Sequence, residues 1–143
     1  MWIAKPRTDR YRQAIKCALV AADELKHPTI EVTHLLCGLI REGTGVAYHV
    51  LSHLEFNFDN FSIVLSKVPQ RQGIPGDCIS DDAKVAVRNS VDWMRRFGHS
   101  HLGTEHLLLS LIENDTVSST LMSCGVQSED VRHEIHGLLG LLP

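Results

Sequence analysis

The chain of 143 residues lacks the features that mark several large functional classes. Its formal net charge is −3, and its lysines and arginines are scattered, so it has no basic surface typical of nucleic-acid binding. No apolar run approaches the roughly 20 residues that a membrane-spanning helix needs. Residues 1–7 lack the apolar core and the cleavage site of a signal peptide. These absences predict a cytoplasmic protein without nucleic-acid or membrane partners.

Catalytic motifs are also missing. The chain contains neither the Gly-x-x-x-x-Gly-Lys-Ser/Thr loop that holds nucleotide phosphates nor the Gly-x-Ser-x-Gly turn of a serine nucleophile. No cysteine lies in a Cys-x-x-Cys pair or a recognisable catalytic setting, so the cysteines are interpreted as thiols of a reducing compartment. They are Cys17, Cys37, Cys78 and Cys124. The sequence therefore predicts no enzyme activity and no cofactor.

Nine histidines leave a metal-binding helical protein as an alternative. Three groups have plausible ligand spacing. They are His99, His101 and His106; His49 and His53; and His133 and His136. None forms a His-Glu-x-x-His motif and no nearby cysteine completes a tetrahedral set, so we expect no metal site. The histidines that precede the two Leu-Leu pairs, His34 and His106, are instead expected to hydrogen-bond the backbone.

What the chain does contain is an internal duplication. Residues 27–36 (HPTIEVTHLL) recur as residues 99–108 (HSHLGTEHLL), at an offset of 72. Over residues 8–40 and 80–112, eight of 33 positions are identical. After residues 43–45 the offset becomes 70, which aligns Leu51 with Leu121. A shared period at low identity indicates a tandem repeat.

Apolar residues recur at three- or four-residue spacing and predict four helices in each copy. The first copy has a long helix with an apolar stripe from Tyr11 to Leu25, followed by shorter helices at about 33–41, 46–54 and 57–67. The second copy repeats this plan. Hydroxyl residues are placed to cap helices at Thr8, Ser80 and Thr104, and Thr116 precedes the apolar residues of a further helix. No stretch alternates as a strand would.

The predicted fold class is all-α, with two pseudo-symmetric four-helix repeats packed into one domain. The repeats are expected at residues 8–68 and 80–141, with a linker rich in proline and glycine at 69–79. Burial between the repeats is predicted for Leu36, Leu39, Ile40, Leu108, Leu111 and Ile112.

The segment 98–111 (GHSHLGTEHLLLSL) closely resembles the Clp amino-terminal repeat, and the resemblance extends over residues 8–68 and 79–141. It implies a non-catalytic domain that binds protein substrates or adaptors for a Clp-type ATP-dependent unfoldase. A stand-alone accessory subunit that docks on a Clp protease is the alternative in another class.

The resemblance also implies a candidate ligand site. In some family members the glutamate of Gly-Thr-Glu-His holds the guanidinium of phosphoarginine, and a threonine at the start of the long helix helps to hold the phosphate. The second copy keeps Ser80, Thr104 and Glu105, whereas the first keeps Thr8 but has Thr33 in place of the glutamate. We therefore expect a pocket in the second repeat, between Ser80 and Glu105. The two aspartates after Ser80 would repel a phosphate, which favours a plain arginine side chain.

Overall fold

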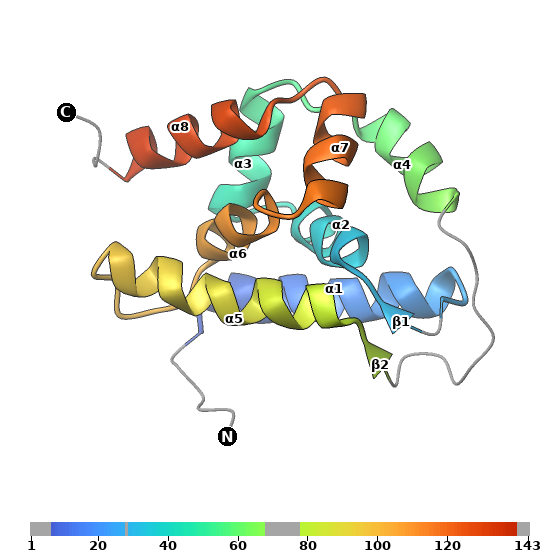
Figure 1. Cartoon of the computed structure of the whole chain (residues 1–143), viewed down its shortest axis with the longest axis horizontal. Coiled ribbons are helices and arrows are strands. Elements are labelled where there is room, and N and C mark those ends of the chain that lie inside the picture. The colour runs from blue at the N-terminus through green and yellow to red at the C-terminus, as the bar shows by residue number, and fades with distance from the viewer. Residues whose placement is uncertain (1–6, 28, 68–77, 140–143) are drawn as a thin grey trace.

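The computed structural model describes residues 7–27, 29–67 and 78–139, which contain eight α-helices and one pair of short strands (Figure 1). The first repeat consists of α1 (Asp9–Glu24), β1 (Thr29–Ile30), α2 (Val32–Glu42), α3 (Val46–His53) and α4 (Phe58–Ser66). The second consists of β2 (Cys78–Ile79), α5 (Asp81–Arg96), α6 (Thr104–Leu111), α7 (Asp115–Ser123) and α8 (Ser128–Leu138). Each half has one long helix followed by three shorter ones, which confirms the predicted all-α duplication, although the short strand follows the long helix in the first half and precedes it in the second.

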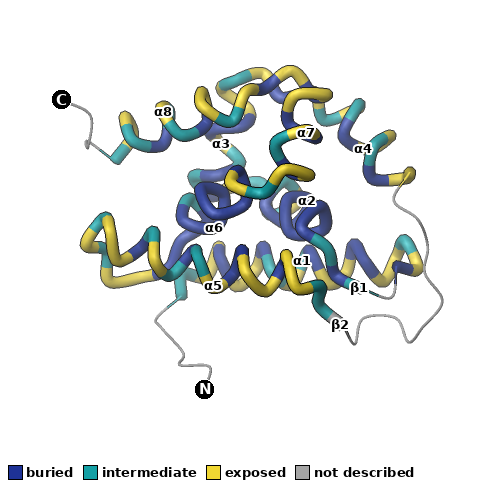
Figure 2. The backbone as a smooth tube through the Cα atoms, in the orientation of Figure 1, coloured by how far each residue is buried: buried dark blue, intermediate teal, exposed yellow. Residues whose placement is uncertain are grey.

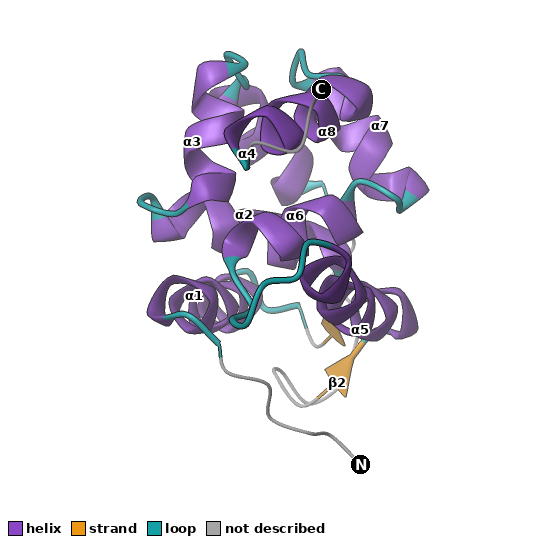
Figure 3. Cartoon of the chain, turned by 90° about the vertical axis from the view of Figure 1, so that its left-hand side faces the viewer, coloured by secondary structure: helices purple, strands orange, loops and turns teal. Residues whose placement is uncertain are grey.

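The helices form layers (Figures 1 and 3). The long helices α1 and α5 lie side by side on one face, α2 and α6 form the middle, and the remaining helices cover the opposite side. The long helices are antiparallel, since each begins beside the segment that follows the other. The Thr8 amide donates to the Leu102 carbonyl at 3.0 Å, and the Ser80 amide donates to the Ile30 carbonyl at 2.9 Å.

The middle layer is the core (Figure 2). Every residue of α2 from Val32 to Leu39 is buried, as is every residue of α6 except Glu105. The predicted core residues Leu36, Leu39, Leu108, Leu111 and Ile112 are buried. Ile40 is only half-buried, so its predicted burial is wrong. It packs against the core near the end of α2 but remains partly exposed there.

Contact between α1 and α2 is unusually close at Gly38. A Cβ atom on this residue would lie 2.2 Å from the Ala14 carbonyl oxygen, so only glycine allows the two backbones to meet here. The aligned position in the second repeat is Ser110, whose hydroxyl donates to the Ala86 carbonyl at 2.5 Å. The two repeats therefore form the equivalent contact between their first and second helices with different residues.

Two predicted caps are confirmed and one is wrong. The hydroxyls of Thr8 and Ser80 accept the amides three residues on, each at 3.1 Å, and so cap α1 and α5. Thr104 is instead the first residue of α6, because the extended backbone that precedes the helix is at Gly103. Helix α7 begins before Thr116 and is capped by the side chain of Asn114.

The parallel pair of β1 and β2 was not expected from the sequence. Thr29 lies opposite Cys78 and Ile30 lies opposite Ile79. Strands of two residues are too short to show an alternating pattern. Residues 78 and 79, the last two of the predicted linker, therefore belong to a strand, and linker residues 69–77 lie outside the described part of the chain.

Candidate binding groove between the two long helices

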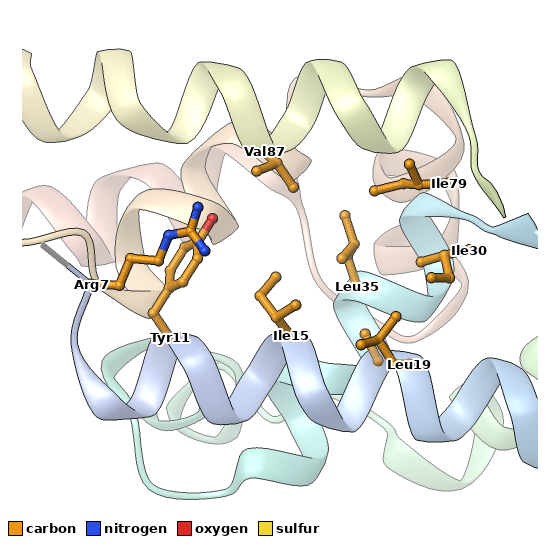
Figure 4. Close-up of a pocket in the computed structure, with 9 residues that line it drawn as sticks. Arg7, Tyr11, Ile15, Leu19, Ile30, Leu35, Ile79 and Val87 are labelled. Atoms are coloured by element: carbon orange, nitrogen blue, oxygen red, sulfur yellow. The ribbon is translucent and has the colours of Figure 1, made fainter. Parts of the chain in front are cut away.

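A groove of about 120 Å³ lies between α1 and α5 (Figure 4). Its described lining is apolar except at one end. The lining residues are Arg7, Tyr11, Ile15, Ala18, Leu19, Ile30, Leu35, Ile79 and Val87. Leu35 of α2 forms the floor, and the strand residues Ile30 and Ile79 close the end opposite Arg7.

Helical spacing explains the wall that α1 contributes. Positions 11, 15, 18 and 19 recur at intervals that place them on one side of the helix. Tyr11 and Ala18 are fully buried, Ile15 is half-buried and Leu19 is 43% exposed. The sequence prediction took Tyr11 and Ala18 as part of a core stripe and missed the groove. The sequence did contain an indication of the groove, because Ile15 and Leu19 extend the apolar stripe of α1 to positions that remain partly exposed.

Polar contacts organise the end of the groove near Arg7. The Ser90 hydroxyl donates to the Val87 carbonyl at 2.6 Å, so the Tyr11 hydroxyl is the donor in its 3.3 Å hydrogen bond to Ser90. The Arg7 guanidinium carbon lies 5.9 Å from the centre of the Tyr11 ring. Burial raises the pKa of Tyr11, which keeps the phenol protonated at neutral pH.

A histidine pair braces the turn before α2, and a second pair braces the turn before α6. The His34 Nδ1 atom accepts the Glu31 amide at 2.8 Å, so the ring proton is on Nε2, which donates to His27 Nδ1 at 2.7 Å. In the second repeat His106 accepts the Gly103 amide at 2.8 Å and contacts His99 at 2.9 Å. This confirms that His34 and His106 bind the backbone.

The two inner histidines are also shifted in acidity. Burial, with a smaller contribution from the neighbouring His27, lowers the pKa of His34 to about 4. Burial, with a smaller contribution from the neighbouring His99, also lowers the pKa of His106 to about 4. Both rings are therefore neutral at physiological pH.

The predicted ligand-site residues are brought together in a different combination from the one expected. The start of α1 lies beside the turn of α6, because Arg7 pairs with Leu102 and the Thr8 amide donates to the Leu102 carbonyl. Ser80 lies beside the other turn, through its amide bond to Ile30. The expected pairing of Ser80 with the Glu105 turn is therefore wrong. Antiparallel packing of α1 and α5 exchanges the partners between the repeats.

The side chains at these turns differ in accessibility. Glu105 is 15% exposed and folds back over Gly103, where a Cβ atom would lie 2.0 Å from its Oε1 atom. Thr104 is 3% exposed, and its hydroxyl accepts the Ala47 amide at 3.3 Å. Thr33 is 5% exposed, and its hydroxyl has no hydrogen-bond partner among the described residues. Both threonines thus face the interior.

The remaining histidines do not gather into a metal centre in the described part of the chain. Within residues 7–27, 29–67 and 78–139, no three His, Cys, Asp or Glu residues are arranged to hold an ion. His53 pairs with Glu134, and His136 Nδ1 lies 2.8 Å from the Arg132 carbonyl.

Over the same described ranges no helix has the length and apolar character needed to cross a membrane.

Comparison with known proteins places this geometry in a family. The Clp repeat (R) N-terminal domain matches residues 7–76 and 78–143. Chaperone protein ClpB of Oceanobacillus iheyensis is 33% identical over 137 residues, which is 93% of this chain and 17% of ClpB. ClpC/MecB of Bacillus subtilis, described as a negative regulator of genetic competence, is 32% identical with the same two coverages. The chain thus spans about a sixth of the length of these relatives.

Solved structures agree with the fold. The Hsp104 N-terminal domain of Candida albicans superposes with a TM-score of 0.83 at 16% identity, over 96% of this chain and 93% of the other. The N-terminal domain of the chaperone ClpD of Arabidopsis thaliana gives a TM-score of 0.69 at 19% identity, over 97% of each chain. With both repeats matched in sequence and the duplicated helical fold shared, the chain belongs to the Clp amino-terminal repeat family.

Proposed function

We propose that the chain is a protein-binding domain that brings substrates or adaptor proteins to a Clp-type ATP-dependent unfoldase or protease. In this proposal an apolar segment of the bound protein lies in the groove between α1 and α5. The family supports the association with Clp machinery, since similar sequences include proteins named as ATP-binding subunits of the ATP-dependent Clp protease. The domain itself carries out no catalytic step.

The observation that carries the proposal is the open apolar groove. Leu19 leaves 43% of its surface exposed at a site lined almost wholly by apolar side chains. Burying one such side chain fully contributes about 1.5–3 kcal/mol. Two or three contacts of this kind, after the cost of ordering the segment, correspond to a dissociation constant between about 1 mM and 1 μM. Such weak binding suits a domain that captures a polypeptide and then releases it.

Fluorescence anisotropy tests the proposal with a labelled, extended apolar peptide. The variant Leu19→Gln should weaken binding about tenfold, since it places an amide where an apolar side chain would dock. The matched control is Ile63→Gln, because Ile63 is 52% exposed on α4, away from the groove. Circular dichroism would show that both variants fold. Equal affinities for Leu19→Gln and Ile63→Gln would contradict the groove as the docking site.

A further inference from the structure

The groove has a positive charge at one end. Arg7 is the one charged side chain among its described lining residues, and it lies beside Tyr11 at the start of α1. The neighbouring Arg12 is not among the lining residues and forms an exposed ion pair with Asp9 at 2.5 Å. Arg7 is thus the charged side chain that the groove lining itself contributes at this end.

The opposite end of the groove is acidic. Glu31 directly follows the lining residue Ile30, and Asp81 and Asp82 follow Ile79 after one intervening serine. Both aspartates are exposed. Within the described residues 78–87, Lys84 is the sole basic residue against these two carboxylates. The partial positive charge at the start of α5 is only about half a unit and does not cancel them.

The separation of the two ends sets the length of segment that could contact both. Arg7 lies over the Tyr11 ring, and Tyr11 contacts Ser90 of α5. From Ser90 back to Asp82, α5 rises over eight residues, or about 12 Å. An extended polypeptide covers that distance in about four residues, at roughly 3.3 Å each. A segment with charges four positions apart would thus place one charge at each end.

We propose that the groove selects extended segments in which an acidic and a basic residue flank about three apolar residues. The acidic side chain lies beside Arg7, the apolar residues lie over Ile15, Leu19 and Val87, and the basic side chain faces the carboxylates at the start of α5. This specificity rests on the proposed protein-binding function, because it names the kind of segment that the same groove binds.

Five peptides of equal length test this selectivity by anisotropy at low salt. Their central residues are Glu-Val-Leu-Val-Lys, Gln-Val-Leu-Val-Gln, Lys-Val-Leu-Val-Lys, Glu-Val-Leu-Val-Glu and Glu-Lys-Val-Leu-Val. The last has the composition of the first but carries both charges at one end. The first peptide should bind about two- to fivefold more tightly than each of the others, as expected for exposed ion pairs. Salt at 0.5 M should remove most of the difference.

Variants at Arg7 locate the effect. Arg7→Lys should retain the preference, and Arg7→Glu should shift it to the peptide with two lysines. The matched control is Arg10→Gln, since the Arg10 side chain donates to the Thr44 hydroxyl at 3.3 Å and is not among the groove residues. It should leave the order of affinities unchanged.

The two proposals fail in different ways. Equal binding of all five peptides, or an unchanged order of affinities in Arg7→Glu, would overturn the charge selectivity and leave groove binding intact. Failure of every peptide to bind, including the neutral one, would overturn both.

Discussion

The Tyr11 hydroxyl of α1 donates a hydrogen bond to the Ser90 hydroxyl of α5 at 3.3 Å, between residues 79 positions apart and in different repeats. Both side chains are fully buried. The bond links the two long helices at the end of the groove where Arg7 lies, and so helps to set the separation of the groove walls there.

Replacing Tyr11 with phenylalanine should destabilise the domain by about 1 kcal/mol. The variant removes the phenol hydroxyl that donates to Ser90, but the Ser90 hydroxyl still donates to the Val87 carbonyl, so no donor is left unpaired. Urea denaturation of Tyr11→Phe, Ser90→Ala and the double variant would measure the coupling of the two residues. If the two single effects simply add, the hydrogen bond does not contribute to stability.

Acid should destabilise the domain through the two inner histidines. Their pKa values are about 4 in the folded protein and near 6.5 in the unfolded chain, so the unfolded chain binds more protons between these values. The stability that they contribute is complete above about pH 6.5 and is lost as the pH falls toward 4. Each site corresponds to at most about 3 kcal/mol, within a typical total of about 5–15 kcal/mol.

Thermal denaturation from pH 8 to pH 4.5 would measure this dependence. The informative variant is His34→Gln, whose amide can accept the Glu31 N–H and donate to His27 without titrating. We expect it to be less stable than the original chain at pH 7.5 but to lose stability less steeply on acidification. An equally steep loss would show that other groups, such as the carboxylates, govern the acid response.

Gly38→Ala should be among the most damaging small substitutions, at about 3 kcal/mol. The added Cβ would lie 2.2 Å from the Ala14 carbonyl oxygen, so α1 and α2 would have to separate. Gly98→Ala is the matched control, since no atom lies within 4 Å of its Cβ position and only its positive φ of 68° is unfavourable. That strain costs about 1–2 kcal/mol. Equal costs for the two variants in urea denaturation would contradict this account of the contact.

The fold was predictable because duplication and helical periodicity are properties of neighbouring positions. The stripe that includes Tyr11, Ala14 and Ala18 follows from spacing alone, as do the hydroxyl caps at Thr8 and Ser80. At Thr104, in contrast, the sequence pattern predicts the wrong capping residue. A hydroxyl at the start of a leucine run suggests a cap, but the position of the cap depended on the His106 ring, which satisfies the Gly103 amide.

The site was less predictable because it joins the two repeats. Alignment of the repeats placed Ser80 and Glu105 in one copy, and nothing in either copy indicates that α1 and α5 run antiparallel. The backbone bonds of Thr8 to Leu102 and of Ser80 to Ile30 set the actual neighbours. The groove was not predicted for the same reason, since its walls come from different repeats, with Leu19 on α1 and Val87 on α5.

The exchanged partners change what we expect of an arginine-type ligand. Asp81 and Asp82 lie at the Ser80 turn, so they no longer oppose a phosphate bound near Glu105. At the Glu105 turn the nearest aspartate on α1 is Asp9, which is paired with Arg12. A phosphoarginine peptide should therefore bind at this turn at least as tightly as an arginine peptide, with the guanidinium on Glu105 and the phosphate near Thr8 and the start of α1.

Titration of both peptides against four variants would check this expectation. Glu105→Ala should abolish binding. Thr8→Ala should weaken the binding of phosphoarginine more than that of arginine, because the Thr8 hydroxyl would contact the phosphate of the ligand and not its guanidinium. Ser80→Ala is the matched control, because it also removes a helix cap, and it should leave both affinities unchanged, since Ser80 lies at the other turn. Thr33→Glu should create a second, weaker site there, because it restores the missing carboxylate. Binding that is insensitive to Glu105→Ala would remove this turn as a ligand site, and dependence on Ser80 in place of Thr8 would contradict the pairing across repeats.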